Sequence, residues 1–195
     1  MTIHTRRTIL VGGAAFAANL FALDRGNAQG LPPTPECTDG NAPTLRQTEG
    51  PYFTPMSPER ADLTEPGMKG QPIEVVGIVL TRGCKPVPGA LLDLWHADDA
   101  GDYDNKGYRL RGHQFADGEG RYRFRTIIPA QYPGRTPHFH IKVQPKGGRT
   151  LTTQLYFPDE PRNARDPIYR RELLMKVAKS DTGPIARFDF VLDIR

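Results

Sequence analysis

Residues 137–143 (PHFHIKV) constrain the fold most, because apolar and polar side chains alternate strictly along them. One set comprises Phe139, Ile141 and Val143, and the other comprises His138, His140 and Lys142. This period of two is typical of a β-strand with one buried face, and it places both histidines on the same side. Two imidazoles at that spacing can converge on one metal ion, although two half-exposed strand residues would show the same tripeptide.

Five further runs predict strands, at residues 73–80, 90–97, 121–127, 151–157 and 186–194. Glycine and proline make up 39 of the 195 residues and fall between these runs, which is typical of a turn-rich β protein. One short C-terminal helix is expected at residues 167–178, with Asp166 as its N-cap and Pro167 in its first position. Together these features predict one all-β domain, a β-sandwich of mixed strands with long loops.

The N-terminus carries the pair Arg6-Arg7, an apolar stretch over residues 9–23, and small residues at Gly26 and Ala28. This pattern predicts a twin-arginine signal peptide over residues 1–28, an extended arm over 29–43 and a folded domain over 44–195. The protein is then expected in the periplasm or secreted, without a membrane span once the signal is cleaved. A retained anchor is the alternative.

The charge balance argues against a nucleic-acid partner. Beyond residue 28 the chain has 23 basic and 21 acidic residues, whereas nucleic-acid-binding proteins concentrate a large basic excess on one face. The chain has two cysteines, Cys37 and Cys84. An oxidising compartment favours a disulfide between them, and two free thiols are the alternative.

Tyr132 and Arg135 precede the two histidines in a loop rich in proline and glycine, where functional side chains are often displayed. A phenol serves as an anionic ligand only when a strongly acidic cation takes its proton, so tyrosine beside histidine indicates ferric iron. The loop after residues 90–97 offers Tyr103 as a second phenol. Its acidic residues, Asp98, Asp99, Asp102 and Asp104, could instead hold calcium.

Four segments in this order resemble the intradiol ring-cleavage dioxygenases, which include the protocatechuate and catechol dioxygenases. The segments are QTEGPY (47–52), WHADDAGDY (95–103), RYRFRTIIPAQYPGRTPHFH (121–140) and LTTQLYF (151–157). The resemblance implies one mononuclear non-haem Fe(3+) ion bound by Tyr103, Tyr132, His138 and His140. It further implies that substrate displaces Tyr132, that Arg135 stabilises anionic species, and that Tyr52 and Gln154 contribute to the substrate pocket.

The resemblance therefore implies an enzyme that takes a small aromatic diol and O2 and cleaves the ring between the two hydroxyl-bearing carbons. The product would be a muconate-type diacid, and the sequence is compatible with a homo-oligomer. Gly134 stands where the protocatechuate enzymes have a tryptophan and a longer loop, which argues against protocatechuate itself. The competing hypothesis is an exported, non-catalytic β-sandwich that binds a ligand or a metal.

Overall fold

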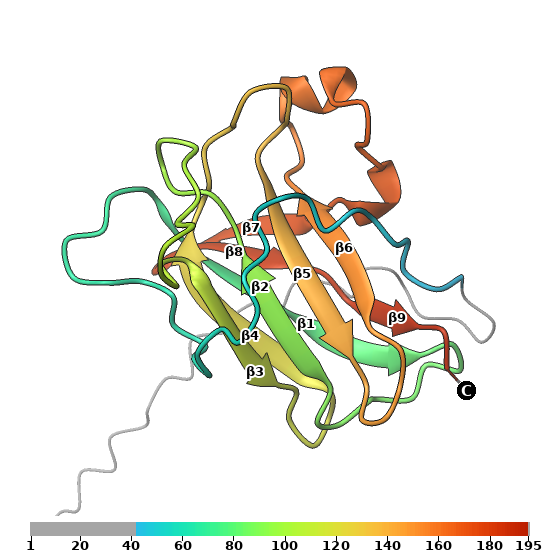
Figure 1. Cartoon of the computed structure of the whole chain (residues 1–195). Helices are drawn as coiled ribbons and strands as arrows, with labels where there is room; N and C mark the ends of the chain where they lie inside the picture. Colours follow the sequence, from blue (N-terminus) through green and yellow to red (C-terminus); the bar gives the residue numbers. More distant parts are fainter. Residues whose placement is uncertain (1–41, 195) are drawn as a thin grey trace, which may run out of the picture.

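The computed structural model describes residues 42–194, in which nine strands form two stacked sheets (Figure 1). The first sheet contains β1 (Pro72–Thr81), β4 (Arg121–Ile127), β7 (Lys176–Ser180), β8 (Gly183–Arg187) and β9 (Phe190–Leu192). The second sheet has the order β3 (Arg111–Phe115), β2 (Leu91–Trp95), β5 (His138–Gln144) and β6 (Leu151–Tyr156). Strands β8 and β9 run parallel to β1 and the other pairs are antiparallel, so the predicted all-β sandwich of mixed strands is confirmed.

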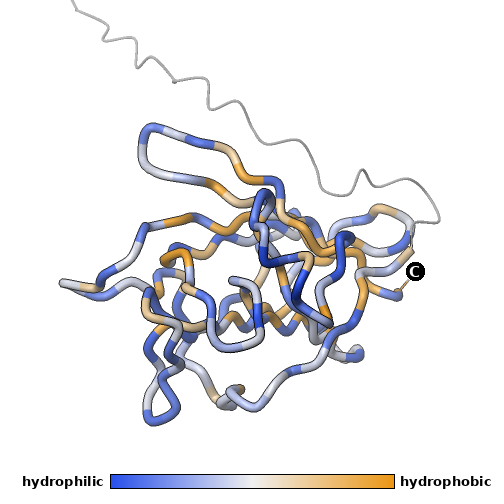
Figure 2. The backbone as a smooth tube through the Cα atoms, turned by 90° about the horizontal axis from the view of Figure 1, so that it is seen from above, coloured by the Kyte–Doolittle hydropathy of each residue, from blue (hydrophilic) through white to orange (hydrophobic). Residues whose placement is uncertain are grey.

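The apolar positions of the alternating strands form one buried core. Within the second sheet, Phe139 pairs with Leu155 on β6 and Ile141 pairs with Leu94 on β2, and all four are completely buried. Burying each such side chain stabilises the fold by about 1.5 to 3 kcal/mol. Figure 2 shows the result as hydrophobic segments inside the molecule and hydrophilic loops around them.

The outer face of the second sheet is polar and is nevertheless buried, because residues 44–60 cross it. At the β6 edge, Gln47 N donates to Thr152 O (2.9 Å). At the β3 edge, His113 N donates to Pro58 O (3.0 Å) and Arg60 N donates to His113 O (2.9 Å). The segment therefore spans the sheet from one edge to the other (Figure 1) and encloses the histidine side of β5.

The helix predicted for residues 167–178 is wrong. This stretch contains the 3-10 turn η2 (Arg171–Leu173) and then enters β7, after the earlier turn η1 (Pro161–Arg165). The backbone is bound to the sheets here, since Met175 N donates to Tyr156 O (2.9 Å) and β7 pairs with β8. Of the residues that suggested an apolar helical stripe, Ile168, Leu173, Leu174 and Val177, this extended path buries only Leu173 fully, and Val177 is 36% exposed.

The strand predicted for residues 186–194 is split into the end of β8 and β9. The β1 ladder is interrupted where Ile78 N donates to the side chain of Asp189 (3.0 Å). Gly77 allows this arrangement, because a Cβ there would lie only 1.8 Å from the carbonyl oxygen of Phe188. Strands β3 and β7 were not predicted, since neither shows clear alternation of apolar residues.

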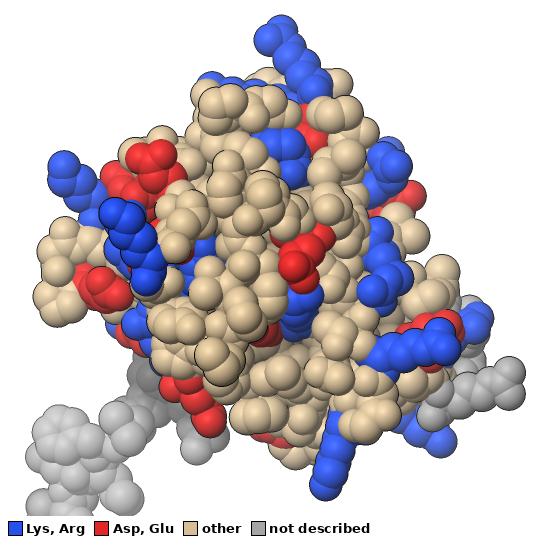
Figure 3. Space-filling view, in the orientation of Figure 1, with Lys and Arg blue, Asp and Glu red and all other residues tan. Residues whose placement is uncertain are grey.

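The signal peptide predicted for residues 1–28 lies outside the described residues, as does nearly all of the predicted arm at 29–43. Within residues 42–194, no helix has the length and apolar character that crossing a membrane requires. Cys84 is disulfide-bonded, and Cys37, its expected partner, is not among the described residues. On the face shown in Figure 3, basic and acidic side chains are interspersed among uncharged ones.

Candidate iron and substrate site

The four predicted metal ligands come together at one end of the second sheet. His138 and His140 lie at the start of β5, Tyr103 lies in the loop after β2, and Tyr132 lies in the loop before β5. The Nε2 atoms of the two histidines are 3.0 Å apart, and His140 Nε2 is 3.0 Å from the Tyr103 hydroxyl. The ring centroid of Tyr132 is 5.7 Å from that of His138 and 5.6 Å from that of Tyr103. The side chains of two phenols and two imidazoles are thus clustered together.

Both histidines are neutral and present Nε2 to this cluster. The Thr136 carbonyl lies 2.6 Å from His138 Nδ1, so Nδ1 carries the proton and Nε2 keeps its lone pair. Burial lowers the pKa of His138 to about 4 and lowers the pKa of His140 well below its usual value. Unprotonated imidazoles at neutral pH are what a metal ion requires of its ligands.

The phenols behave in the opposite way. Burial raises the pKa of Tyr103, and Tyr132 adds to the effect, whereas Arg135 and Arg111 oppose it. Burial likewise raises the pKa of Tyr132, with Arg135 opposing. Both hydroxyls are therefore protonated in the metal-free protein, and only a strongly acidic cation would convert them to phenolates.

The spacing of the donors fits one bound cation. Donors held about 2.1 Å from one ion lie about 3.0 Å apart when they subtend a right angle, which matches both measured separations. Within residues 42–194, no group of three His, Cys, Asp or Glu side chains is placed to hold a metal ion. The donors gathered here are two imidazoles and two phenols, and phenolate with imidazole suits ferric iron.

Acidic side chains build the loop that carries Tyr103. Asp98 Oδ1 accepts from the backbone N–H groups of Ala100 and Asp102, each at 2.9 Å. Asp104 accepts from the N–H groups of Lys106, Gly107 and Arg109. Asp98 and Asp104 thus hold the backbone that carries Tyr103, and among the described residues no three acidic, histidine or cysteine side chains are grouped to hold a metal ion such as calcium.

Gly101 brings the two tyrosine-bearing loops together. Its φ is +92°, and a Cβ at this position would lie 2.2 Å from the Gln131 carbonyl oxygen. Only glycine combines this backbone conformation with so close an approach. Gly101, two residues before Tyr103, therefore allows the loop that carries Tyr103 to approach the loop that carries Tyr132.

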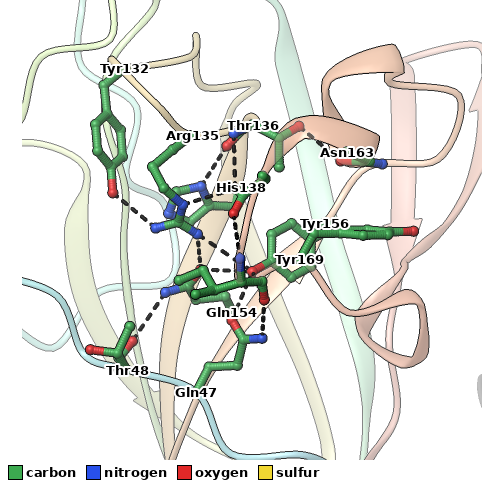
Figure 4. Close-up of polar contacts among 12 residues, drawn as sticks. Gln47, Thr48, Tyr132, Arg135, Thr136, His138, Gln154, Tyr156, Asn163 and Tyr169 are labelled. Carbon is green, nitrogen blue, oxygen red and sulfur yellow. Dashed lines mark hydrogen bonds and ion pairs between the residues drawn. The ribbon is translucent and has the colours of Figure 1, made fainter.

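Arg135 connects several side chains of the site (Figure 4). Its Nη1 donates to the Tyr132 hydroxyl (3.0 Å), its Nη2 donates to Gln154 Oε1, and its Nε donates to Asp166 Oδ2 (2.8 Å). The Arg135 side chain is 12% exposed and that of Asp166 is fully buried. Burial alone would lower the pKa of Arg135, but the hydrogen bond to Asp166 and the charges nearby raise it, so the guanidinium is a fixed cation beside Tyr132.

Gln154 and Tyr52, the two predicted substrate contacts, lie on different sides of the ligand cluster. Gln154 is fully buried, and its Nε2 donates to Thr48 O (3.1 Å) while its Oε1 accepts from Arg135. Tyr52 is half-buried and its ring stacks on that of Tyr103, with centroids 4.5 Å apart and planes at 21°. Gln154 thus contacts Arg135, and Tyr52 lies at the phenol side of the site.

Two other histidines are structural. His96 Nε2 is 2.6 Å from Thr126 Oγ1 and its Nδ1 is 2.7 Å from Ala97 O. His113 Nδ1 lies 2.7 Å from Ser57 O. Neither joins the cluster.

The residues that sequence reasoning missed are those that hold the ligands in place. Asp166 was assigned to a helix N-cap, and it does accept from Ile168 N (3.0 Å), but its other oxygen binds Arg135 and Thr136 N. Trp95 stacks on His140, with centroids 5.0 Å apart and planes at 10°. A carboxylate in a cap position carries no sequence signal for its second role.

The chain is similar in sequence to known dioxygenases. The Dioxygenase_C family model, described as dioxygenase, matches residues 48–195. The protocatechuate 3,4-dioxygenase beta chain of Burkholderia cepacia is 38% identical over 151 residues, covering 65% of this chain and 64% of that one. A hydroxyquinol 1,2-dioxygenase of Rhizobium sp. is 33% identical, covering 62% of this chain and 50% of that one. The chain thus spans about half to just under two thirds of the length of these relatives.

Two solved structures share the fold and part of the sequence. The dioxygenase domain of a dioxygenase and carbohydrate-binding protein fusion from Streptomyces sp. SirexAA-E has a TM-score of 0.77 and 50% identity, covering 79% of this chain and all of that one. The 3-chlorocatechol 1,2-dioxygenase of Rhodococcus opacus 1CP has a TM-score of 0.73 and 29% identity, covering 80% and 74% of the two chains.

Proposed function

Because this chain belongs to the Dioxygenase_C family, we propose that it is a non-haem iron(III)-dependent intradiol dioxygenase that cleaves a catechol-type ring between its hydroxyl-bearing carbons with O2. The product is a muconate-type diacid. The observation that carries this proposal is the clustering of Tyr103, Tyr132, His138 and His140 next to the cation of Arg135. His140 Nε2 lies 3.0 Å from both His138 Nε2 and the Tyr103 hydroxyl, and the Tyr132 hydroxyl accepts from Arg135. The curated relatives named above, a protocatechuate and a hydroxyquinol dioxygenase, support the same class of substrate.

The two phenols and two imidazoles would hold the ferric ion. Once bound there, the ion supplies the Lewis acidity that fixes both oxygens of a deprotonated diol and makes the ring reactive toward O2. His138 and His140 are suited to remain as ligands, because both are buried on β5.

Tyr132 is suited to leave and to move a proton. It is half-buried in a loop, and its hydroxyl oxygen already accepts a hydrogen bond from Arg135 Nη1. With the ferric ion bound, Tyr132 would be a phenolate, and it would take up one proton from an entering diol and become a neutral phenol while Arg135 remains as a hydrogen-bond donor. The same guanidinium, held by Asp166 and Gln154, then provides a fixed positive charge for the negative charge that develops on the substrate.

Gly134 is exposed, and no neighbouring atom covers it. A Cβ at Gly134 would meet no atom within 4 Å, and the residue has a φ of +79°. The protein therefore lacks the bulky wall that the resemblance assigns to the protocatechuate enzymes at this place. We propose a catechol-type diol other than protocatechuate as the substrate.

The proposed location is the periplasm or the outside of the cell, and the support for it is the Arg6-Arg7 pair with its apolar stretch. Replacing both arginines by lysine should leave the protein in the cytoplasmic fraction. Export that continues unchanged would contradict this part of the proposal.

The activity is tested with purified protein loaded with ferric iron. We expect a visible tyrosinate-to-iron absorption that shifts on adding catechol under nitrogen, and uptake of one O2 per diol with formation of a muconate absorbance in air. Tyr103→Phe and Tyr132→Phe should each lose most of the activity and change the visible band. Tyr108→Phe is the matched control, since Tyr108 lies in the same loop as Tyr103 but its hydroxyl donates to Pro55 O (3.0 Å) outside the cluster.

A protein that stays colourless after ferric loading would refute the proposal and favour the non-catalytic binding module. Colour without O2 uptake on any catechol-type diol would refute the catalytic part alone.

A further inference from the structure

Arg111, the first residue of β3, is a buried cation whose purpose the proposed reaction does not explain. The residue is 1% exposed. Among residues 42–194 it has no carboxylate within ion-pair distance, and its Nη2 atom has no hydrogen-bond partner. Burying an unpaired guanidinium is unfavourable, so the contacts that Arg111 does make must offset that cost.

Those contacts lie on the two sides of Tyr103. Arg111 Nε donates to the carbonyl oxygen of Asp104 (2.9 Å), the residue that follows Tyr103. Arg111 Nη1 donates to the carbonyl oxygen of Tyr52 (2.6 Å), and the Tyr52 ring stacks on the Tyr103 ring at 4.5 Å. One side chain therefore binds both the backbone next to Tyr103 and the backbone of Tyr52, whose ring stacks on Tyr103.

Strand pairing extends this arrangement to the histidine side. Arg111 on β3 pairs with Trp95 on β2, and Trp95 pairs with His140 on β5 and stacks on its ring. Tyr103 and His140, whose donor atoms are 3.0 Å apart, are thus each supported by one member of a cross-strand pair. Positions on adjacent strands of a sheet are held more rigidly than positions in a loop.

We propose that Arg111 is a positioning residue that clamps Tyr103 between residues 52 and 104 and directs its hydroxyl toward His140. The proposal deepens the function given above, because it assigns the residue that makes the Tyr103 loop a preformed part of the site. Arg111 contacts neither ligand oxygen nor ligand nitrogen, and it acts through Tyr52 and Asp104.

The experiment compares two substitutions of Arg111. Arg111→Met removes the hydrogen-bond donors and the charge, whereas Arg111→Lys keeps the charge but cannot donate to Asp104 O and Tyr52 O from the two separate nitrogens of a guanidinium. Arg60→Met is the matched control. Arg60 donates to the carbonyl oxygens of Arg111 and Tyr108. The Arg60→Met substitution therefore removes two arginine–carbonyl hydrogen bonds from the same region and leaves the bonds to Tyr52 and Asp104 in place. Folding of each variant is checked by thermal unfolding.

The first readout needs no metal. In protein with 13C-labelled tyrosine rings, the Tyr103 signal is assigned with Tyr103→Phe. In Arg111→Met, and to a smaller extent in Arg111→Lys, it should move toward the shift of an unstacked tyrosine, and in Arg60→Met it should stay in place. The second readout is ferric iron affinity, which should fall about 10- to 100-fold in Arg111→Met, as for other residues that orient metal ligands.

A folded Arg111→Met or Arg111→Lys protein with an unchanged Tyr103 signal overturns the proposal, as does an equal shift in Arg60→Met. If Arg111→Met does not fold, the Lys variant decides the question. A wild-type protein that binds no iron would refute the proposed function, whereas the ring shift in the metal-free protein tests the clamp independently.

Discussion

Replacing Asp166 by asparagine is expected to destabilise the metal-free protein by about 3 kcal/mol at pH 7. The carboxylate is fully buried and accepts three hydrogen bonds, from Arg135 Nε, Thr136 N and Ile168 N. An asparagine of nearly the same shape removes the negative charge and leaves Arg135 without its anionic partner.

The magnitude follows from the exposure of the pair. Breaking a buried ion pair by removing one partner typically costs about 3 to 5 kcal/mol. The lower end applies here, because Arg135 is 12% exposed and retains the oxygens of Tyr132, Gln154 and Tyr156 as acceptors. For a domain of this size, 3 kcal/mol corresponds to a fall in Tm of about 6 to 12 °C.

The penalty should depend on pH with a definite sign. Burial by itself would raise the pKa of Asp166, but the hydrogen bonds from Thr136, Arg135 and Ile168 lower it below 3.8. A carboxyl whose folded-state pKa is lowered contributes stability above its unfolded pKa and loses it as the pH falls through the folded value. The difference between wild type and Asp166→Asn should therefore be complete at pH 7 and shrink below about pH 4.

The assay is urea denaturation followed by fluorescence of the single tryptophan, Trp95, which is buried. A double-mutant cycle with Arg135→Met isolates the pair, and the second substitution should cost much less once the first is present. Independent, additive effects, a loss below about 1 kcal/mol at pH 7, or a loss that stays the same at about pH 3 as at pH 7, would each refute the reasoning.

Three further outcomes are expected. Gly101→Ala should separate the two tyrosine loops and lower ferric iron affinity at least about tenfold, whereas Gly118→Ala, where a Cβ meets no atom within 4 Å, should leave it unchanged in the same titration. Phe139→Ala should cost about 3 to 5 kcal/mol in urea denaturation, because the ring is fully buried between the sheets. His96→Gln should make the free energy of unfolding depend less on pH between about pH 6.5 and pH 4. Burial lowers the pKa of His96 to about 4, so over this range the unfolded wild type takes up a proton that the folded protein does not, and the wild type loses stability. An unchanged slope in the variant would contradict this account of His96.

The sequence predicted those parts of the fold that depend on local alternation. The run at 121–127 became β4 with the predicted bounds, and Phe139, Ile141 and Val143 are buried as predicted. The helix at 167–178 failed because pairing with β6 and β8 overrides a weak helical stripe, which no local pattern reveals. Likewise, a regular alternation over 186–194 could not show the ladder break between Ile78 and Asp189.

The site divides in the same way. His138 and His140 are two residues apart, so strand geometry alone predicts that they share a face. Tyr103 required the family resemblance, since its loop also contains Tyr108. Asp166 and Arg111 were missed because their contacts reach residues 31 and 59 positions away, and such distances leave no periodic trace.

Residues 44–60, the segment that covers the site, also constrain the order in which the chain can fold. Thr44 N donates to Val191 O (2.8 Å), and Val191 N donates to the Thr44 side chain (2.9 Å). The first residue of this segment is therefore bound to β9, 147 positions later in the sequence. Contacts of such sequence separation form late and slowly. Residues 44–60 can therefore pack on the second sheet in this way only after β9 has been synthesised and paired with β1. The closed site is therefore a product of the completed chain, and amide protection in the Tyr103 and Tyr132 loops should arise in the final phase of refolding.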